Sequence, residues 1–274
     1  MTVSIHDIVL GDGARLVLFA GPCVVENREM IVSTAEALRS AAERHGLPLV
    51  FKSSFVKANR TSGRSFTGIG REEALRILDD LRREYALPVI TDVHNVDDVA
   101  AAAEAVDVLQ IPAFLCRQTE LLQAAGRTGR AVNIKKGQFM APEDMAHAAS
   151  KIADTGNRRI LLTERGTTFG YHNLVVDMRS LVIMGRTGYP VILDATHSVQ
   201  LPGGDAPNAR SGGQPEFIFP IARAGVAVGC DGLFVEVHPD PPRALSDAAS
   251  QLPLERLDQL LAQVSHLDAM VKGW

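Results

Sequence analysis

The stretch LPLVFKSSFVKANRTSGRSFTGIGREEALRILDDLRREY, residues 47–85, contains one complete unit of the pattern that runs through this chain. Its apolar start, Leu47–Phe51, is typical of a buried strand, and its end, Arg71–Tyr85, is typical of a helix. The loop between them carries four cations among hydroxyl residues and glycines: Lys52, Lys57, Arg60 and Arg64. So many charged donors at the end of a strand suit an anionic ligand; a solvated surface loop is the alternative interpretation.

The same order, a short apolar run and then a helical stretch, repeats along the rest of the chain. Eight strands are predicted, at residues 16–20, 47–51, 88–93, 106–111, 131–134, 159–162, 191–193 and 232–235. The helices predicted after them span residues 27–45, 71–85, 96–105, 119–126, 142–155, 173–184, 215–228 and 254–271. Continuous apolar strands that alternate with helices imply a parallel sheet.

Eight such units in a chain of 274 residues match a closed (β/α)8 TIM barrel, which usually has roughly 250 residues. A doubly wound open sheet is the alternative, but the sequence does not indicate the switch point that it needs. At the N-terminus, Val3–Val9 and Arg15–Ala20 flank Gly11-Asp12-Gly13, which indicates a β-hairpin. We expect this hairpin region, residues 1–14, to close the bottom of a barrel within a single domain spanning residues 1–274.

The composition excludes several classes of protein. A net charge of −4 does not suit a general nucleic-acid binder. The N-terminus has no signal-peptide pattern, and Arg223 interrupts the long apolar run Phe217–Cys230, so we expect no membrane segment. Three cysteines without a C-x-x-C spacing do not form a disulfide framework, which favours the cytoplasm.

Catalytic groups of such a barrel lie at the C-terminal ends of its strands. Cations gather after the second, fourth, fifth and sixth predicted strands: Lys52, Lys57, Arg60, Arg117, Lys135 and Arg165. They would repel one another unless an anion lay between them. Their number suits a phosphorylated carboxylate or two phosphorylated substrates, with Lys136 and Arg64 expected to point outward into water.

Cysteine, histidine and acidic residues gather after the first, seventh and eighth predicted strands, which adjoin one another in a closed barrel. Cys23, His197 and Glu236 can then converge on one divalent metal, with Asp247 as a fourth ligand. A mixed set of sulfur, nitrogen and oxygen ligands suits Zn, Fe, Mn or Co better than Mg or Ca. The alternatives are a buried apolar cysteine and a structural histidine.

The glycine-rich stretch LPGGDAPNARSGG, residues 201–213, has no hydrophobic period. It is interpreted as a mobile loop after the seventh strand that can close over a site. The sequence has no P-loop and no G-x-S-x-G elbow, so neither a P-loop nucleotide site nor a hydrolase triad is supported.

Long collinear motifs resemble the family of 3-deoxy-D-manno-octulosonate 8-phosphate synthases, from about Val3 to Gly273. They include GPCVVE (21–26), FKSSFVKANRTS (51–62), LQIPAFLCRQT (109–119), NIKKGQF (133–139), DATHSVQLPGG (194–204) and FVEVHPDPPRALSDAASQLPL (234–254). The related 3-deoxy-D-arabino-heptulosonate 7-phosphate synthases share the barrel and the G-P-C start. They usually carry K-P-R-T where this chain has Lys57-Ala58-Asn59-Arg60, which favours the octulosonate enzyme.

The resemblance implies that phosphoenolpyruvate condenses with D-arabinose 5-phosphate and water, with release of phosphate, to make a precursor of lipopolysaccharide. By similarity, the phosphoenolpyruvate-binding residues are Lys52, Ser54, Lys57, Gln110, Lys135 and Arg165. The arabinose 5-phosphate-binding residues are Asn59, Arg60, Thr61 and Asp92. The family is usually homotetrameric, and Arg117 is expected near an interface. Two alternatives are a heptulosonate synthase that uses erythrose 4-phosphate and a non-catalytic barrel that senses a sugar phosphate.

The metal-independent branch of this family has asparagine where this chain has Cys23. The resemblance therefore implies a divalent metal (Zn, Fe, Mn or Co) bound by Cys23, His197, Glu236 and Asp247. The catalytic residues it suggests are Lys57, His197 and Asp247, with proton relay by one of the last two; Cys23 as a covalent nucleophile is the rival interpretation. One departure is Val56, which replaces an aspartate common in the family and is expected to alter the surroundings of Lys57.

Overall fold

The protein is described by a computed structural model of residues 1–58, 65–205 and 210–273. Eight parallel strands form its central sheet: β3 (Val17–Gly21), β4 (Leu49–Lys52), β5 (Val89–Asp92), β6 (Val108–Ile111), β7 (Ala131–Lys135), β8 (Ile160–Glu164), β11 (Val191–Asp194) and β14 (Gly232–His238). The sheet closes because β11 pairs with both β8 and β14. Closure confirms the predicted barrel and excludes the doubly wound open sheet. A short strand, β15 (Leu252–Pro253), adds to β14.

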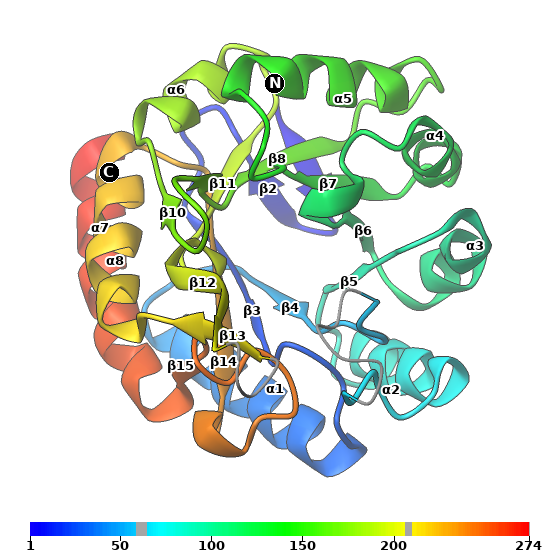
Figure 1. Ribbon diagram of the computed structural model, residues 1–274, viewed down its shortest axis with the longest axis vertical. Helices are drawn as coiled ribbons and strands as arrows, with labels where there is room; N and C mark the ends of the chain where they lie inside the picture. Colours follow the sequence, from blue (N-terminus) through cyan, green and yellow to red (C-terminus); the bar gives the residue numbers. More distant parts are fainter. Residues whose placement is uncertain (59–64, 206–209, 274) are drawn as a thin grey trace.

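Each barrel strand is followed by a helix on the outside, so that the helices surround the strands as a ring (Figure 1). They are α1 (Arg28–Arg44), α2 (Arg71–Glu84), α3 (Val96–Ala105), α4 (Thr119–Arg127), α5 (Met145–Ala153), α6 (Arg179–Gly185), α7 (Ile218–Val228) and α8 (Leu257–Lys272). Short 3-10 helices span Ala113–Leu115, Pro142–Asp144, His197–Val199, Pro215–Phe217, Pro241–Arg243 and Leu254–Arg256. Among the described residues, no helix is both long and apolar enough to cross a membrane.

The helix predicted over residues 173–184 is only half correct. Its first residues form β10 (Leu174–Val175), which pairs with β9 (Thr167–Thr168), and α6 begins at Arg179. The Asp177 carboxylate accepts a hydrogen bond from the backbone N–H of Arg179 at 3.0 Å. An aspartate in this position satisfies a free N–H group of the first turn and so favours a helix start there.

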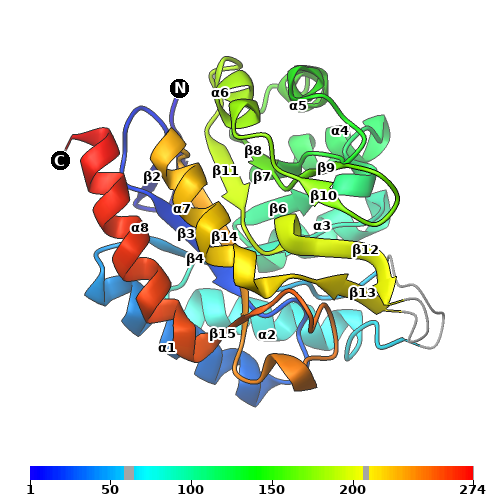
Figure 2. The same ribbon diagram turned by 60° about the vertical axis from the view of Figure 1, so that its left-hand side comes forward.

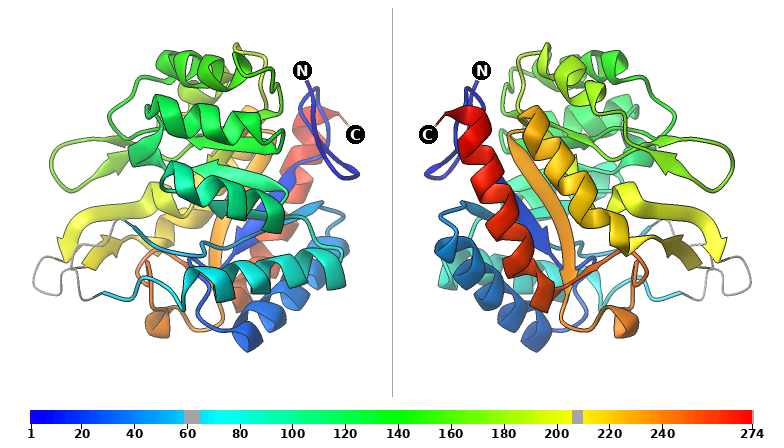
Figure 3. Two further views of the ribbon diagram at one scale, coloured as in Figure 1. Left: turned by 90° about the vertical axis from the view of Figure 1, so that its right-hand side faces the viewer. Right: turned by 90° about the vertical axis from the view of Figure 1, so that its left-hand side faces the viewer.

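The N-terminal hairpin closes the bottom of the barrel as expected, but its turn lies elsewhere. β1 (Val3–Ile5) pairs with β2 (Ile8–Leu10), and His6 in the turn has a positive φ of 52°. The hairpin predicted around Gly11-Asp12-Gly13 is wrong, because the following strand is fully paired with β4 and β14 inside the barrel. Figure 3 shows this hairpin at one end of the molecule and the β9–β10 and β12–β13 arms at the other.

The interior of the barrel is apolar at the hairpin end and polar at the opposite end. The hairpin packs against inward-facing side chains of the strands, namely Val17, Phe19, Val50, Ile90, Val108, Ala131, Leu161, Ile192 and Phe234. Because side chains alternate along a strand, the next inward position lies two residues further on. These positions hold buried polar residues: Lys52, Asp92, Gln110, Asn133, Thr163, Asp194 and Glu236. The alternation of the strands thus builds a polar layer directly above an apolar one.

The glycine-rich stretch after β11 is an ordered two-stranded arm in its described part, and not the irregular loop that its composition indicates. β12 (Gln200–Asp205) pairs antiparallel with β13 (Arg210–Gly213), with an irregular register between Leu201 and Asp205. Figure 2 shows the arm extending from the end of the barrel. Residues 206–209 lie outside the described part of the chain.

Candidate active site

A cavity of about 1650 Å³ opens at the C-terminal end of the barrel, where the sequence predicts the site. Its walls include eight of the predicted site residues, among them Lys57, Asp92, Lys135, Arg165, His197 and Asp247. Lys52 and Gln110 also border it, whereas Ser54 does not, although it is buried nearby. Asn59, Arg60 and Thr61 lie outside the described residues, as does Arg64, so the roles expected for them stay predictions.

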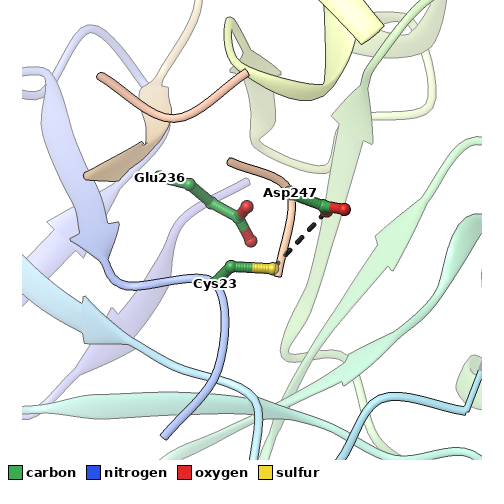
Figure 4. A group of neighbouring side chains, drawn as sticks. All are labelled: Cys23, Glu236 and Asp247. Atoms are coloured by element: carbon green, nitrogen blue, oxygen red, sulfur yellow. Dashed lines mark hydrogen bonds between the residues drawn. The ribbon is translucent and has the colours of Figure 1, made fainter. Parts of the chain in front are cut away.

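Three of the four predicted metal ligands lie together (Figure 4). One ligand atom from each of Cys23, Glu236 and Asp247 lies within 4.8 Å of the others. Cys23 follows β3, Glu236 belongs to the neighbouring β14, and Asp247 lies in the loop after β14 with a positive φ of 49°. Closure of the barrel is what brings the two ends of the chain together here.

His197 lies beside this group on the cavity side. Its Nε2 atom is 3.7 Å from Glu236 Oε1 and 3.8 Å from Asp247 Oδ2, and Cys23 Sγ is 3.4 Å from Asp247 Oδ2. Ligands of a tetrahedral ion with bonds of about 2.0–2.3 Å are themselves about 3.3–3.8 Å apart. The donor types and the printed separations from His197 to Glu236 and Asp247 fit a divalent transition metal, although His197 does not lie within 4.8 Å of all three of the other ligands.

Asp194 contacts both the ring and the backbone of His197, although no role was predicted for this aspartate. The distance from His197 Nδ1 to Asp194 Oδ2 is 2.7 Å, and Asp194 Oδ1 accepts the backbone N–H groups of Thr196 and His197 at 3.1 and 2.9 Å. A carboxylate on the second nitrogen is the usual partner of a metal-binding histidine because it fixes the tautomer and the ring. The inward direction of Asp194 could have been predicted from the sequence, because it lies two residues after the inward-facing Ile192.

Cys23 is held from two sides. Its thiol donates to Ser246 Oγ at 2.9 Å, and its backbone N–H donates to Gln251 Oε1 at 3.2 Å. Burial, together with the negative charges of Asp247 and Glu236, raises the pKa of the Cys23 thiol well above its usual value. A protonated thiol is a poor nucleophile, which argues against covalent catalysis by Cys23, whereas a bound cation favours the thiolate.

The prediction that the rim lysines need an external anion to offset their repulsion is wrong for two of them. Lys52 forms a buried ion pair with Glu236, and Lys135 forms one with Asp194. Burial lowers the pKa of Lys135 to about 8 despite the nearby Asp194 carboxylate. The alternation of inward side chains supplies these acidic partners from neighbouring strands.

Lys57 has no such close ion-pair partner within residues 1–58, 65–205 and 210–273, where the nearest carboxylate oxygen, Asp92 Oδ2, is 4.0 Å from its Nζ atom. Burial alone would lower the pKa of Lys57, but its interactions with the Cys23 sulfur and with the Glu236 and Asp92 carboxylates raise that pKa, so the ammonium stays charged. Val56, next to it, packs its apolar side chain against the main hydrophobic core. Where the resemblance implies an aspartate, this chain therefore has a valine that contributes to core packing beside Lys57.

Arg165 combines one satisfied and one unsatisfied nitrogen. Nη2 donates to Gln200 Oε1 at 2.9 Å, whereas Nη1 is buried without a hydrogen-bond partner among the described residues. Buried donors without partners are uncommon and costly in folded proteins. A guanidinium with one free edge is suited to bind a phosphate or carboxylate, so Arg165 is the clearest candidate for an anion-binding group in the cavity.

Asp92 is the centre of a chain of hydrogen bonds across the barrel. Ser54 Oγ and Gln110 Nε2 both donate to its carboxylate. Gln110 in turn accepts from Asn133 Nδ2 at 3.0 Å, and Asn133 accepts from Thr163 Oγ1 at 2.6 Å. Ser54 thus acts on the cavity through Asp92.

Two of the basic residues noted in the sequence, Lys136 and Arg117, do not line the cavity. Lys136 was expected to point into water, but it is fully buried on the helix side of β7. Its Nζ is 3.5 Å from Glu164 Oε1 and donates to Thr167 Oγ1 at 2.9 Å, so the neighbouring strand supplies an ion-pair partner. Arg117 is exposed and borders a separate hollow near the start of α4.

These features define a class of protein: a (β/α)8-barrel enzyme whose mouth joins buried cationic groups to a candidate metal centre. Within this class, the chain belongs to the DAHP synthetase I family, which it matches over residues 1–273.

Three curated relatives share the name 2-dehydro-3-deoxyphosphooctonate aldolase. The protein from Syntrophotalea carbinolica is 56% identical over 272 residues, covering 99% of this chain and 98% of the relative. The Acidithiobacillus ferrooxidans protein is 57% identical over 256 residues, covering 93% and 90%. That from Geobacter sulfurreducens is 53% identical over 270 residues, covering 98% of both chains.

Proposed function

We propose that this protein condenses phosphoenolpyruvate with D-arabinose 5-phosphate and water to give 3-deoxy-D-manno-octulosonate 8-phosphate and inorganic phosphate. The observation that carries the proposal is the unpartnered Nη1 of Arg165 in a cavity beside Lys57, Lys135 and the Cys23 cluster. The cavity belongs to a chain that is 53–57% identical to 2-dehydro-3-deoxyphosphooctonate aldolases over nearly its whole length. The product is a precursor of lipopolysaccharide.

The buried cations bind phosphoenolpyruvate, which carries a phosphate and a carboxylate. Arg165 offers its free Nη1 edge, and Lys57 and Lys135 offer point charges from two other strand ends. Gln110 borders the same space, while Lys52 and Ser54 act through their partners Glu236 and Asp92. Arabinose 5-phosphate binds beside it, with Asp92, which contacts Gln110 and lies near Lys57, at the sugar hydroxyls. By similarity, Asn59, Arg60 and Thr61 take its phosphate end.

The reaction needs two additions and one elimination. C3 of phosphoenolpyruvate forms a carbon–carbon bond with the aldehyde carbon of the pentose, whose oxygen takes up a proton. Water adds to C2, and the C2–O bond to phosphate then breaks, leaving the ketone and inorganic phosphate. One proton of the water ends on the new hydroxyl and the other on the phosphate. Holding both reactants in line removes much of the entropic barrier.

Cys23, His197, Glu236 and Asp247 are the residues we assign to a divalent metal, namely Zn, Fe, Mn or Co. Such an ion supplies Lewis acidity, which polarises a carbonyl or lowers the pKa of water. Of the two proposed proton carriers, Asp247 is favoured over His197. Both ring nitrogens of His197 face carboxylates, Nε2 toward Glu236 and Asp247 and Nδ1 toward Asp194.

A second candidate function is the synthesis of 3-deoxy-D-arabino-heptulosonate 7-phosphate from erythrose 4-phosphate, which is favoured by the name of the matching family. Phosphate release from phosphoenolpyruvate, measured with each sugar in turn, separates the two. We expect release with arabinose 5-phosphate and little with erythrose 4-phosphate. The reverse preference would move the assignment to the heptulosonate reaction, and no release with any pentose or tetrose phosphate would indicate a non-catalytic sugar-phosphate sensor.

We also propose a cytoplasmic homotetramer. Cys23, Cys116 and Cys230 are all free thiols, which persist in a reducing compartment. Large apolar side chains are exposed in loops at the C-terminal end of the barrel: Phe114, Phe139, Phe169 and Tyr171. Exposed apolar surface of this kind supports packing against further copies. Light scattering at micromolar concentration should give four times the chain mass; a monomer mass would contradict the assembly.

A further inference from the structure

Gln200, the first residue of β12, connects the anion-binding part of the cavity to the candidate metal centre. Its Oε1 accepts a hydrogen bond from Arg165 Nη2 at 2.9 Å, and its Nε2 donates to Asp247 Oδ2 at 3.1 Å. The same Asp247 oxygen lies 3.4 Å from Cys23 Sγ and 3.8 Å from His197 Nε2. A single amide group is therefore hydrogen-bonded both to the Arg165 guanidinium and to a predicted metal ligand, Asp247.

The chemistry of the two partners fixes the direction of this amide. A guanidinium can only donate hydrogen bonds, so it must face the amide oxygen; an ionised carboxylate can only accept, so it must face the NH2 group. A flipped amide would lose both bonds. Glutamate would keep the contact with Arg165 but oppose Asp247, and an apolar side chain would make neither contact.

The backbone around Gln200 is held against the loop that carries Asp247. Gln200 lies opposite Gly213 at the base of the arm, and the backbone N–H of Gln214 donates to Val199 O at 2.9 Å. A Cβ atom on Gly213 would lie 2.3 Å from the carbonyl oxygen of Ala249, so arm and loop are in direct backbone contact. This contact leaves little room for Gln200 to move independently of Asp247.

We propose that Gln200 is a positioning residue that couples the binding of phosphoenolpyruvate at Arg165 to the binding of a divalent metal at Asp247. The inference rests on the proposed function and adds a pathway between its two sites. An anion on Nη1 fixes the guanidinium, the guanidinium fixes the amide, and the amide holds the Asp247 carboxylate in place for the metal. Because the first ligand orders groups that the second also needs, each ligand tightens the binding of the other by the same factor.

The test is a titration of Mn²⁺ into chelator-treated full-length protein by calorimetry, with and without phosphoenolpyruvate and without any sugar phosphate, so that no turnover occurs. For the wild type we expect phosphoenolpyruvate to tighten Mn²⁺ binding roughly tenfold. Gln200→Met keeps the length of the side chain but removes both hydrogen bonds. It should weaken Mn²⁺ binding roughly tenfold, as loss of an outer-shell partner of a metal ligand does. The substitution should also reduce the effect of phosphoenolpyruvate on Mn²⁺ binding to less than about threefold. The effect that remains would come from direct charge attraction between the two ligands.

Gln214→Met is the matched control. Gln214 lies at the same base of the arm, but its side chain neither lines the cavity nor makes a hydrogen bond among the described residues. It should keep both wild-type values. If Gln200→Met does not fold, as judged by circular dichroism, Gln200→Ser takes its place with the same expectations.

Three outcomes would each overturn the inference. The Gln200 variant could keep the wild-type coupling, the Gln214 control could show equal losses, or phosphoenolpyruvate could have no effect on Mn²⁺ binding by the wild type. Failure of the proposed function is seen separately. A wild type that couples Mn²⁺ to phosphoenolpyruvate but releases no phosphate with arabinose 5-phosphate would keep the coupling and remove the reaction.

Discussion

At the hairpin end of the barrel, Phe19 and Phe234 pack with Ile5 and Leu10 of the hairpin in a dry apolar layer. Two residues beyond the apolar positions Val50, Ile192 and Phe234 of this layer are Lys52, Asp194 and Glu236, which are just as buried but are charged. Burying ion pairs contributes little net stability, whereas burying apolar side chains contributes much. The contrast therefore indicates that the apolar layer stabilises the barrel and that the charged layer is retained for binding and chemistry.

Two of the three buried cysteines, Cys23 and Cys230, show the same contrast. Burial raises the pKa of Cys230, which precedes β14, to about 12, and the residue belongs to the main hydrophobic core. Cys23, equally buried, lies within 4.8 Å of two carboxylates. The same residue type is thus a packing element at one position and a candidate ligand at the other.

The largest expected effect, on metal binding, comes from replacing Cys23. Cys23→Asn should weaken metal binding by at least about 100-fold, because a direct ligand matters more than an outer-shell partner. Residual metal-free activity in this variant would identify cysteine as a ligand. The matched variant Cys230→Ala should keep full metal affinity, measured by calorimetry, and lose only stability. Complete loss of activity in Cys23→Asn, with metal still bound, would support a nucleophilic cysteine instead.

Leu10→Ala tests the apolar layer. It should lower the free energy of unfolding by about 2–5 kcal/mol, since it leaves a cavity between the hairpin and the barrel. Chemical denaturation measures the loss, and the Michaelis constants for both substrates should not change in the folded variant. A large change in a Michaelis constant with unchanged stability would mean that the hairpin end takes part in the site.

Arg165→Lys keeps the charge but removes the planar guanidinium. The Michaelis constant for phosphoenolpyruvate should rise roughly 30-fold, corresponding to about 2 kcal/mol for a hydrogen bond to a charged group. The constant for arabinose 5-phosphate should change much less. Steady-state kinetics with each substrate varied in turn measures both constants. Equal increases in the two constants would mean that Arg165 has a general structural role.

The smallest expected effect is a pH dependence from Lys135. Burial lowers the pKa of Lys135 to about 8, so rising pH removes a positive charge from the site. The value of kcat/KM for phosphoenolpyruvate should therefore fall about tenfold from about pH 7 to about pH 9, because this ratio reports the free enzyme. Lys135→Arg stays charged and should lack this alkaline limb. An unchanged profile in that variant would assign the limb to another group.

Most of the fold could be predicted from the sequence because eight apolar runs alternate with eight helical stretches. The errors lie where local signals compete. Gly11-Asp12-Gly13 is a good turn sequence, but β3 already has two partners in the barrel, and the hairpin turns at His6 instead. The arm after β11 contains strands made largely of glycine and polar residues, which have neither apolar alternation nor high strand propensity.

The proximity of the candidate ligands Cys23, Glu236 and Asp247 could be predicted because barrel closure makes the ends of β3, β11 and β14 neighbours. The surroundings of the cations could not, because ion pairs such as Lys135–Asp194 and Lys136–Glu164 depend on which face each strand residue takes. Gln200 gave no signal at all. An amide acquires its role only from the side chains placed at its two ends, and here these come from β8 and from the loop after β14.

The most direct test of the account is phosphate release from phosphoenolpyruvate and arabinose 5-phosphate before and after treatment with a chelator. We predict release that disappears on chelation and returns with Mn, Co, Zn or Fe, because the polar end of the barrel joins a candidate anion site to a candidate metal site. Release that is unaffected by chelation would contradict a catalytic role for the Cys23 cluster. No release under any of these metals would contradict the proposed reaction itself.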